Sequence, residues 1–333
     1  MKRLIFLILI FTVAVQFLEA QDPQFSQYYT IPLYLGPSFA GTTKGSRLNV
    51  NYRNQFPALP KAFTTMAVSF DHYFYKFRSG IGLILLRDRA GEGHLGITNA
   101  GFQYSFDFNI NRKWKARPGV YFAYSQRSVD ISALEVPSGT LGGSSTQRIP
   151  NDRVLAFDFG TSFLTYSKDH WFGFSIDHLT QPNLSLYSDQ QYKIGRKYSV
   201  YGGTRIIRSG RLIRTLSESV NASFLFKSQD NHYQLDLGGY WYKVPFMFGL
   251  WFRGLPFYKV GDELRVFSRD ALIFMFGYKI ENFSIGYSFD ATISNLLVTR
   301  TAGGHEISIV YLFNQEWERQ KRPKRRPIPC PSF

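Results

Sequence analysis

Residues 101–109 read Gly-Phe-Gln-Tyr-Ser-Phe-Asp-Phe-Asn, and the order of these side chains decides the fold class. Aromatic residues stand at every second position, and small or polar residues stand between them. Successive side chains of a β-strand point to opposite faces of the sheet, so this stretch would have one aromatic and one polar face. The same alternation recurs in residues 157–163 and 283–290. It predicts an all-β protein built from two-faced strands.

The composition indicates what the aromatic faces contact. The chain has 333 residues, including 32 Phe and 21 Tyr, and aromatic residues make up 17% of it. The opposite faces favour Ser, Gly, Asn, Gln and Asp, whereas a soluble sandwich usually has an aliphatic inner face and a charged outer one. An apolar outward face suits lipid, and a polar inward face suits water or packed polar groups. Because every backbone group in lipid must be paired, we predict a closed, transmembrane antiparallel β-barrel.

About fourteen such segments follow one another, an even number as in bacterial barrels. The predicted strands lie near residues 46–54, 62–71, 80–88, 97–109, 116–127, 153–167, 169–178, 197–209, 215–227, 231–242, 244–253, 269–279, 282–290 and 305–314. The long connections are 128–152, 179–196, 254–268 and 291–304, and the tight ones are 167–169, 243 and 281. Long outer loops and tight periplasmic turns are typical of outer-membrane barrels. The connection at 229–230 is short where a long one is expected.

Residues 1–20 have the layout of a secretory signal peptide. Lys2 and Arg3 precede an apolar run over residues 4–15, and Ala20 is a small residue at the expected cleavage site. A retained membrane anchor is the alternative, although the run is short for a helix that spans a bilayer. No apolar stretch beyond residue 20 reaches 18 residues, so we predict no transmembrane helix.

Two segments flank the predicted barrel of residues 46–314. Residues 21–45 contain three prolines and are predicted to form an irregular N-terminal arm in the periplasm. Residues 315–333 are rich in proline and basic residues and are predicted to form an extended, solvated periplasmic tail. Its basic side chains are Arg319, Lys321, Arg322, Lys324, Arg325 and Arg326. We therefore expect the protein in the outer membrane of a Gram-negative cell, with both termini in the periplasm.

The chain is basic, with a net charge of +15, and removal of residues 1–20 leaves 37 basic and 23 acidic residues. Such a charge suits nucleic acid, but an exported protein rarely meets any, so we predict no nucleic-acid partner. Anionic lipid head groups, lipopolysaccharide or an acidic protein partner fit better. The tail either binds such a partner or merely stays solvated, and the sequence leaves both open. Cys330 is the single cysteine, so no internal disulfide can form.

Candidate chemical sites are few. None of the six histidines makes a metal-binding pair at short spacing and nothing marks a nucleophile, so we predict no metal, no cofactor and no enzyme. His305 and Glu306 are interpreted as a polar pair where the last strand meets water. Five aspartates project to the polar faces of strands, where they either line a passage or pair with inward Arg and Lys: Asp107, Asp158, Asp177, Asp236 and Asp290.

Five short motifs stand near the ends of the chain. They are Asp-Pro-Gln-Phe-Ser-Gln-Tyr at 22–28, Pro-Ser-Phe-Ala-Gly at 37–41, Gly-Tyr-Ser-Phe-Asp with a following Ile-Ser at 286–294, Gly-His-Glu-Ile-Ser at 304–308 and Cys-Pro-Ser-Phe at 330–333. In this order, and with similar barrel spacing between them, they resemble the PorP/SprF family of type IX secretion-system outer-membrane proteins. Gly36 and Ser38 depart from the family's usual Asn and Ala, a difference that concerns the local turn.

The resemblance implies an outer-membrane barrel that supports the export of surface proteins, including gliding adhesins, and it brings no catalytic residues. Besides outer-membrane lipid, it implies two partners: a periplasmic, peptidoglycan-associated protein of the same system, and a secreted client protein with a C-terminal sorting domain. The leading hypothesis is a docking or anchoring barrel. The alternatives are a porin-like solute channel, because fourteen strands can enclose a small aqueous lumen, and a membrane enzyme.

Overall fold

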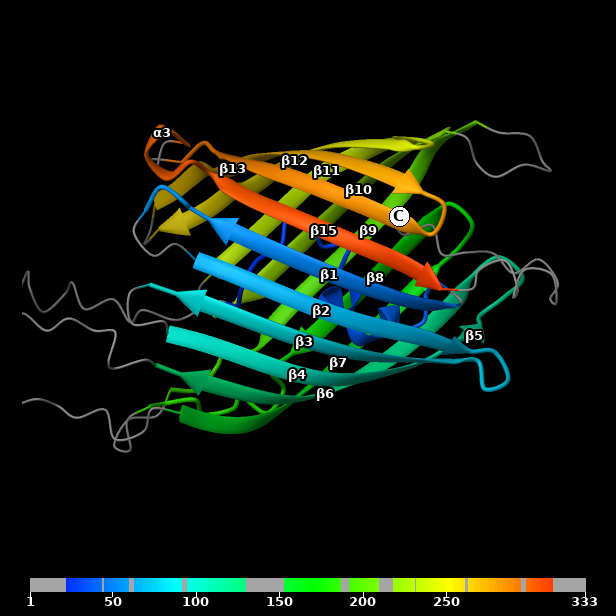
Figure 1. Ribbon diagram of the computed structural model, residues 1–333, viewed down its shortest axis with the longest axis horizontal. Helices are drawn as coiled ribbons and strands as arrows, with labels where there is room; N and C mark the ends of the chain where they lie inside the picture. Colours follow the sequence, from blue (N-terminus) through cyan, green and yellow to red (C-terminus); the bar gives the residue numbers. More distant parts are fainter. Residues whose placement is uncertain are drawn as a thin grey trace, which may run out of the picture.

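The alternating segments of the sequence form the wall of one barrel in the computed structural model (Figure 1). The structure describes residues 22–43, 45–59, 63–91, 95–129, 153–186, 192–209, 218–230, 232–260, 263–294 and 298–313. Within these ranges fourteen strands span the wall, and a further strand of two residues, β5, pairs like β4 with β6. The predicted fold class, a closed antiparallel barrel of about fourteen strands, is confirmed.

The strands follow one another around the wall in chain order. Their bounds are β1 (Ser46–Gln55), β2 (Phe63–Phe74), β3 (Ser79–Ala90), β4 (Leu95–Phe106), β5 (Phe108–Asn109), β6 (Lys115–Ser128), β7 (Arg153–Tyr166), β8 (His170–Asp177), β9 (Lys197–Ser209), β10 (Glu218–Gln229), β11 (His232–Lys243), β12 (Phe246–Val260), β13 (Glu263–Ile280), β14 (Phe283–Thr292) and β15 (Gly304–Phe313).

The barrel closes where the last strand meets the first. β15 pairs with β1 over the full length of both strands, from Ser46 opposite Phe313 to Gln55 opposite Gly304. β4 pairs with β6, so among the described strands the wall has no free edge. In lipid an open edge would leave backbone groups unpaired at a cost of several kcal/mol each, which is why a sheet in a membrane must close.

The two faces of the strands point as the alternation predicts. In β4 the aromatic side chains of Phe102 and Tyr104 are exposed on the outside, whereas Gln103 and Ser105 are buried. Large exposed apolar side chains recur around the wall, among them Phe122, Phe157, Phe174, Leu250, Phe274 and Ile307. Such an apolar outer band suits the hydrocarbon of a bilayer. None of the helices that the structure describes has the length and hydropathy to cross a membrane.

The two ends of the barrel differ in their connections. At the tight-turn end, on the right in Figure 1, Ser46 and Phe313 lie side by side, and residues 167–169 and 281–282 join strands by short turns. At the loop end, residues 178–196 form a long connection, and residues 293–303 contain helix α3 (Val298–Thr301). Nearly all of the long predicted loop 128–152 lies outside the described residues.

One predicted loop is a hairpin instead. Residues 254–268 form the loop-end parts of β12 and β13, and their pairing continues to Val260 opposite Glu263. This stretch contains aromatic and β-branched residues such as Phe257, Tyr258 and Val266, which are residue types that favour strands. The pairing of β12 with β13 therefore continues where the alternation of the sequence becomes indistinct.

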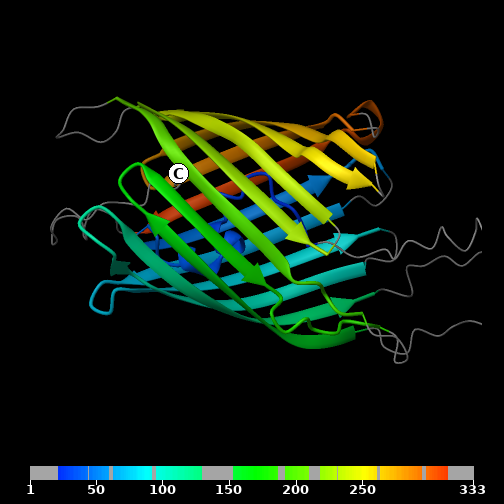
Figure 2. The same ribbon diagram turned by 180° about the vertical axis from the view of Figure 1, so that it is seen from behind.

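The N-terminal segment lies inside the barrel. Residues 22–43, here called the plug, contain helix α2 (Pro32–Leu35) and the 3₁₀ turn η1 (Pro37–Phe39) and are otherwise irregular, as their prolines predict. The plug is seen in dark blue between the strands of the wall in Figures 1 and 2. Its large apolar side chains are almost completely buried: Phe25, Tyr28, Tyr29, Ile31, Leu33, Leu35 and Phe39.

The plug corrects the expectation of an arm outside the barrel. A wall of fourteen strands encloses more space than its own inward side chains fill, so the lumen can accept a chain segment. Outside the barrel the apolar side chains of residues 22–43 would meet water, whereas in the lumen they are buried at about 25 cal/mol for each Å² of apolar surface. Burial of these apolar side chains therefore stabilises the segment inside the lumen.

Candidate functional site

The plug runs the length of the lumen. At the loop end, the Asp22 carboxylate accepts hydrogen bonds from Lys197 Nζ at 2.7 Å and from His178 Nε2 at 3.0 Å. At the tight-turn end, the Gly41 backbone N–H donates to Asp71 Oδ2 at 2.8 Å. Asp22 and Phe313, the first and last described residues, consequently lie at opposite ends of the barrel. The two described ends thus differ from the expected arrangement, in which both termini of the chain lie on one side.

The plug touches the wall all the way round. Hydrogen bonds, ring contacts or close backbone approaches join it to each of the fourteen spanning strands. Two wall glycines allow the backbone of the plug to lie directly against the sheet. A Cβ on Gly80 would stand 2.0 Å from the Ala40 carbonyl oxygen, and one on Gly119 would stand 2.4 Å from the Ser38 nitrogen.

A buried carboxylate of the last strand holds the first part of the plug. Glu306 accepts the Ser26 backbone N–H at 2.7 Å and the Gln27 backbone N–H at 3.2 Å, one with each carboxylate oxygen. The Gln27 side chain donates to the Glu306 carbonyl at 2.9 Å and accepts from the Ser308 hydroxyl at 2.7 Å. Hydrogen bonds to an ionised carboxylate are among the strongest in proteins, so Glu306 fixes the position of the plug along the lumen.

The Ser26 hydroxyl lies at the centre of an ionic cluster. It donates to Asp290 Oδ2 at 2.6 Å and accepts from Arg53 at 2.8 Å and from Arg253 at 3.0 Å. The two guanidinium groups also pair directly with Asp290, at 2.7 Å from Arg53 and 3.2 Å from Arg253. Strands β1, β12 and β14 are thus joined to one another through a single side chain of the plug.

A second arginine contact lies nearer the tight-turn end. Arg117 of β6 is fully buried and donates to the backbone carbonyls of Ser38, at 3.1 Å, and Ala40. The Ser162 hydroxyl of β7 accepts the Ser38 backbone N–H at 2.7 Å. The irregular backbone of the plug therefore finds in wall side chains the hydrogen-bond partners that no secondary structure supplies.

Aromatic side chains fill the rest of the lumen. Tyr28 meets Trp251 edge to face with ring centroids 5.3 Å apart, and Phe39 lies 5.4 Å from the ring of Tyr201. Tyr29 stacks on Tyr240 at 6.1 Å. These contacts turn the middle of the lumen into an apolar core that joins plug and wall.

The structure buries all five aspartates that the sequence singled out. Asp290 belongs to the Ser26 cluster, and Asp236 pairs with Arg253 at 3.3 Å. Asp107, which lies between β4 and β5, accepts hydrogen bonds from the hydroxyls of Tyr73 at 3.2 Å and Tyr166 at 3.1 Å.

The two remaining aspartates lie at the loop end. Asp158 contacts His178 Nδ1 at 2.6 Å, and Asp177 pairs with Lys197 Nζ at 3.2 Å. His178 and Lys197 both also contact Asp22, so these aspartates support the residues that hold the start of the plug. The six basic residues of the predicted tail, and Cys330, lie outside the described residues.

Sequence reasoning missed the residues that hold the plug. Glu306, interpreted as half of a polar pair in water, is fully buried and bound to the plug, whereas His305 remains at the rim beside Tyr287. Arg53 and Arg253 were not singled out, although each stands on the polar face of its strand. A charged side chain on that face was the available signal, because an inward charge in a barrel needs a partner. No group of three or more possible metal ligands occurs within the described ranges.

Comparison with protein families decides the identity of the barrel. Residues 17–311 match the family described as type IX secretion system membrane protein PorP/SprF, a span that takes in the plug and almost the entire wall. The chain belongs to this family. The family resemblance is thereby confirmed over a span that holds four of the five motifs and leaves out residues 330–333, and this PorP/SprF member is an outer-membrane component of the type IX secretion system.

Solved structures and curated proteins add little to the PorP/SprF assignment. The outer membrane protein Omp33 of Acinetobacter baumannii is 7% identical, covers 81% of this chain and 100% of its own, and has a TM-score of 0.41. The KdgM porin is 8% identical over 80% of this chain and 99% of its own, with a TM-score of 0.37. A mutant of the Rh. blastica porin is 8% identical over 80% and 98%, with a TM-score of 0.35. No curated protein matches the chain.

The start of the plug is held by charged groups at neutral pH in this PorP/SprF member. Burial by itself would raise the pKa of the Asp22 carboxyl, but His178 and Lys197 hold that pKa well below its usual range. Burial by itself would lower the pKa of His178, but the carboxylates of Asp22 and Asp158 outweigh it and raise the pKa to about 10. The imidazolium and the carboxylate are therefore both ionised and paired.

His178→Gln is expected to destabilise the barrel most at acidic to neutral pH. The pKa of His178 is higher in the folded barrel than the ordinary value near 6.5, so the stability it contributes is complete below about pH 6.5 and is lost as the pH rises through about 10. The unfolding temperatures of wild type and variant are measured in detergent micelles at about pH 6, 8 and 10.5. They should differ most at pH 6 and approach each other as the pH rises. His232→Gln, at an exposed site, is the control. If the difference in unfolding temperature between wild type and His178→Gln stays constant or widens as the pH rises, His178 is not the charged partner of Asp22 and Asp158.

Proposed function

We propose that this barrel docks or anchors secreted surface proteins, such as gliding adhesins, at its loop end and connects to periplasmic machinery at its tight-turn end. The observation that carries the proposal is the occupied lumen. The backbone and side chains of the plug together contact every spanning strand, so the barrel offers a rigid platform with fixed ends. A solute channel needs an open passage, and the packing of Tyr28, Tyr29 and Phe39 against the wall speaks against one.

The same proposal sets the orientation in the membrane. Outer-membrane barrels place tight turns in the periplasm and long loops outside, so the loop end would face the exterior. The tail of residues 315–333 follows Phe313 at the tight-turn end and would enter the periplasm. There its basic side chains would meet a peptidoglycan-associated partner of the secretion system.

Photo-cross-linking in intact cells tests the docking role. A photoreactive phenylalanine analogue replaces Leu59, exposed in the 56–62 connection at the loop end, or Phe77, exposed in the 75–78 turn at the other end. The Leu59 probe is expected to capture a secreted protein with a C-terminal sorting domain, whereas the Phe77 probe captures none. Equal capture of such a protein by both probes, or none by either, refutes the docking role.

The plug predicts where the start of the processed chain appears. An epitope with a flexible linker, inserted between Gln21 and Asp22, is expected to bind antibody on intact cells, because Asp22 is held at the loop end. An epitope after Phe333 is the matched control and is expected to bind only after the outer membrane is permeabilised. Protection of the first epitope in intact cells would contradict the orientation.

Deletion of the tail is expected to leave the barrel folded but to weaken its association with periplasmic proteins. A chain lacking residues 315–333 retains every strand of the wall, so the barrel should keep its resistance to unfolding by detergent. The amount of periplasmic secretion-system protein recovered with it should fall severalfold, because the six basic side chains of the tail are removed. Recovery is measured by mass spectrometry of detergent extracts. Full recovery with the truncated barrel would remove the tail from the proposal.

A further inference from the structure

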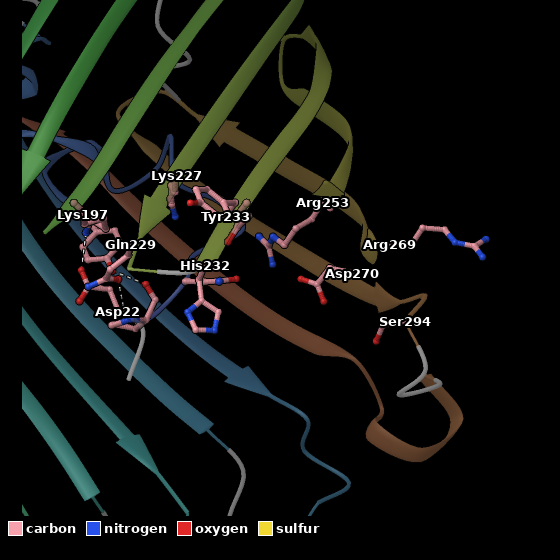
Figure 3. A pocket seen from close by; sticks show the side chains of 15 residues that line it. Asp22, Lys197, Lys227, Gln229, His232, Tyr233, Arg253, Arg269, Asp270 and Ser294 are labelled. Carbon is pink, nitrogen blue, oxygen red and sulfur yellow. Dashed lines mark hydrogen bonds and ion pairs between the residues drawn. The ribbon is translucent and has the colours of Figure 1, made fainter. Parts of the chain in front are cut away.

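A cavity of about 280 Å³ lies at the loop end of the lumen, beside the first residues of the plug (Figure 3). Plug and wall share its lining, since Asp22, Pro23 and Gln24 contribute to it together with residues near the loop ends of β10 to β13. Its size suits one or two side chains of a peptide, and its position is where the barrel is proposed to meet secreted proteins.

The lining carries more positive than negative charge. Its basic side chains are Lys197, Lys227, Arg253 and Arg269, and its acidic ones are Asp22 and Asp270. Two of these cations are already neutralised. Lys197 pairs with Asp22 at 2.7 Å, and Arg253 pairs with Asp236 and Asp290.

Arg269 is exposed, so the partly buried lining cation that the plug and the wall do not pair is Lys227. No hydrogen bond or ion pair joins its side chain to any residue within the described ranges. Its cross-strand neighbour Gln234 donates instead to both oxygens of Asp236, at 2.8 and 2.9 Å. Lys227 is half-buried, and Figure 3 shows its side chain between Asp22 and Arg253. Its ammonium group is partly desolvated, and the carboxylates of Asp236 and Asp22 act on its charge without forming an ion pair with it, so an anionic ligand in direct contact would stabilise it further.

We propose that this cavity binds a carboxylate of a secreted client polypeptide, with Lys227 as its cationic partner; the choice of client rests on the proposed function. The amide side chains of Gln24, Gln229 and Gln234 surround the same space. Amides both donate and accept hydrogen bonds, as the backbone of a bound peptide requires. The carboxylate comes from an acidic side chain or from the C-terminus of the client, and the probes below distinguish these two sources.

The test measures peptide binding to the full barrel in detergent micelles by calorimetry. The probes are N-acetyl-Gly-Glu-Gly-amide, with a side-chain carboxylate, and N-acetyl-Gly-Gly-Gly, with a free C-terminus; N-acetyl-Gly-Gln-Gly-amide lacks both. We expect saturable binding of one or both acids, and a loss of affinity of about tenfold in Lys227→Gln. Lys227→Arg should keep the affinity, because the cation remains. Lys243→Gln, in β11 at the tight-turn end, is the matched control and should bind like wild type.

Any one of four results overturns the site. Neither acid binds, the glutamine peptide binds as tightly as the acids, the Lys227→Gln barrel binds the acids as tightly as wild type does, or inorganic phosphate binds more tightly than either acid. The site and the proposed function can fail separately. Client capture at Leu59 without peptide binding overturns the site alone, whereas peptide binding without client capture leaves the site standing and overturns the docking role.

Discussion

A barrel that lacks residues 25–39 is expected to conduct ions steadily in planar bilayers, whereas the full chain stays silent. The deleted segment supplies the apolar side chains that pack at the centre of the lumen. Without it, the inward faces of fourteen strands enclose a polar space large enough for water and ions. Single-channel recording of purified protein measures the difference. Steady conductance by the full chain would contradict the filled lumen and restore the solute-channel hypothesis.

A second variant tests the same claim with the whole plug retained. The deletion also removes the plug groups that Arg117 and Glu306 bind at Ser38, Ser26 and Gln27, which lowers the fraction of assembled barrels. Gly119→Leu keeps every plug residue, but its Cβ would stand 2.4 Å from the Ser38 nitrogen and so push the plug off the wall. Conductance is expected to appear in Gly119→Leu and not in Val120→Leu, whose side chain faces outward on the same strand. Silence of Gly119→Leu in assembled barrels would show that the plug does not control the passage.

Glu306→Ala is expected to cause the largest loss of stability among single substitutions at the plug. The change leaves the Ser26 and Gln27 N–H groups unpaired and removes a counter-ion of Arg53, which lies 3.4 Å from Glu306. Removal of one partner from a buried ionic network costs about 3–5 kcal/mol. Urea unfolding of the barrel in lipid vesicles measures the change as a lower midpoint. Glu306→Gln should lose less, since its amide oxygen still accepts a hydrogen bond.

Glu218→Ala is the control for this loss. Glu218 is only partly buried at the tight-turn end, where it accepts a hydrogen bond from the Trp241 indole at 2.9 Å. Substitutions at such sites usually change stability by about 0.5 kcal/mol or less. A double-mutant cycle that combines Glu306→Ala with Arg53→Met then measures the interaction between Glu306 and Arg53, because residues of one network do not contribute additively. Equal midpoints for Glu306→Ala and Glu218→Ala would mean that Glu306 does not hold the plug.

The strands of the wall were predictable because their signal is local. The side a residue faces depends only on its position along the strand, so alternation in residues 101–109 places Phe102 outside and Gln103 inside before any partner is known. The count of strands follows in the same way. This kind of prediction fails at residues 254–268, because there the alternation fades while the backbone pairing of β12 and β13 continues.

The residues at which the plug is held were not predictable, because their signal is not local. Ser26 and Glu306 are 280 positions apart, and each stands in a motif that gives no distance to the other. Polarity on the inward face marked Asp290 as buried, but not that it meets Arg53, Arg253 and the Ser26 hydroxyl.

The sequence alone therefore determined a membrane barrel, its strands, the direction of their side chains and the irregular character of residues 22–43. Only the tertiary structure decided that this segment fills the lumen and crosses from one end of the barrel to the other. The space it occupies does not exist until β1 and β15 pair, since a lumen belongs to the closed wall and to no single strand.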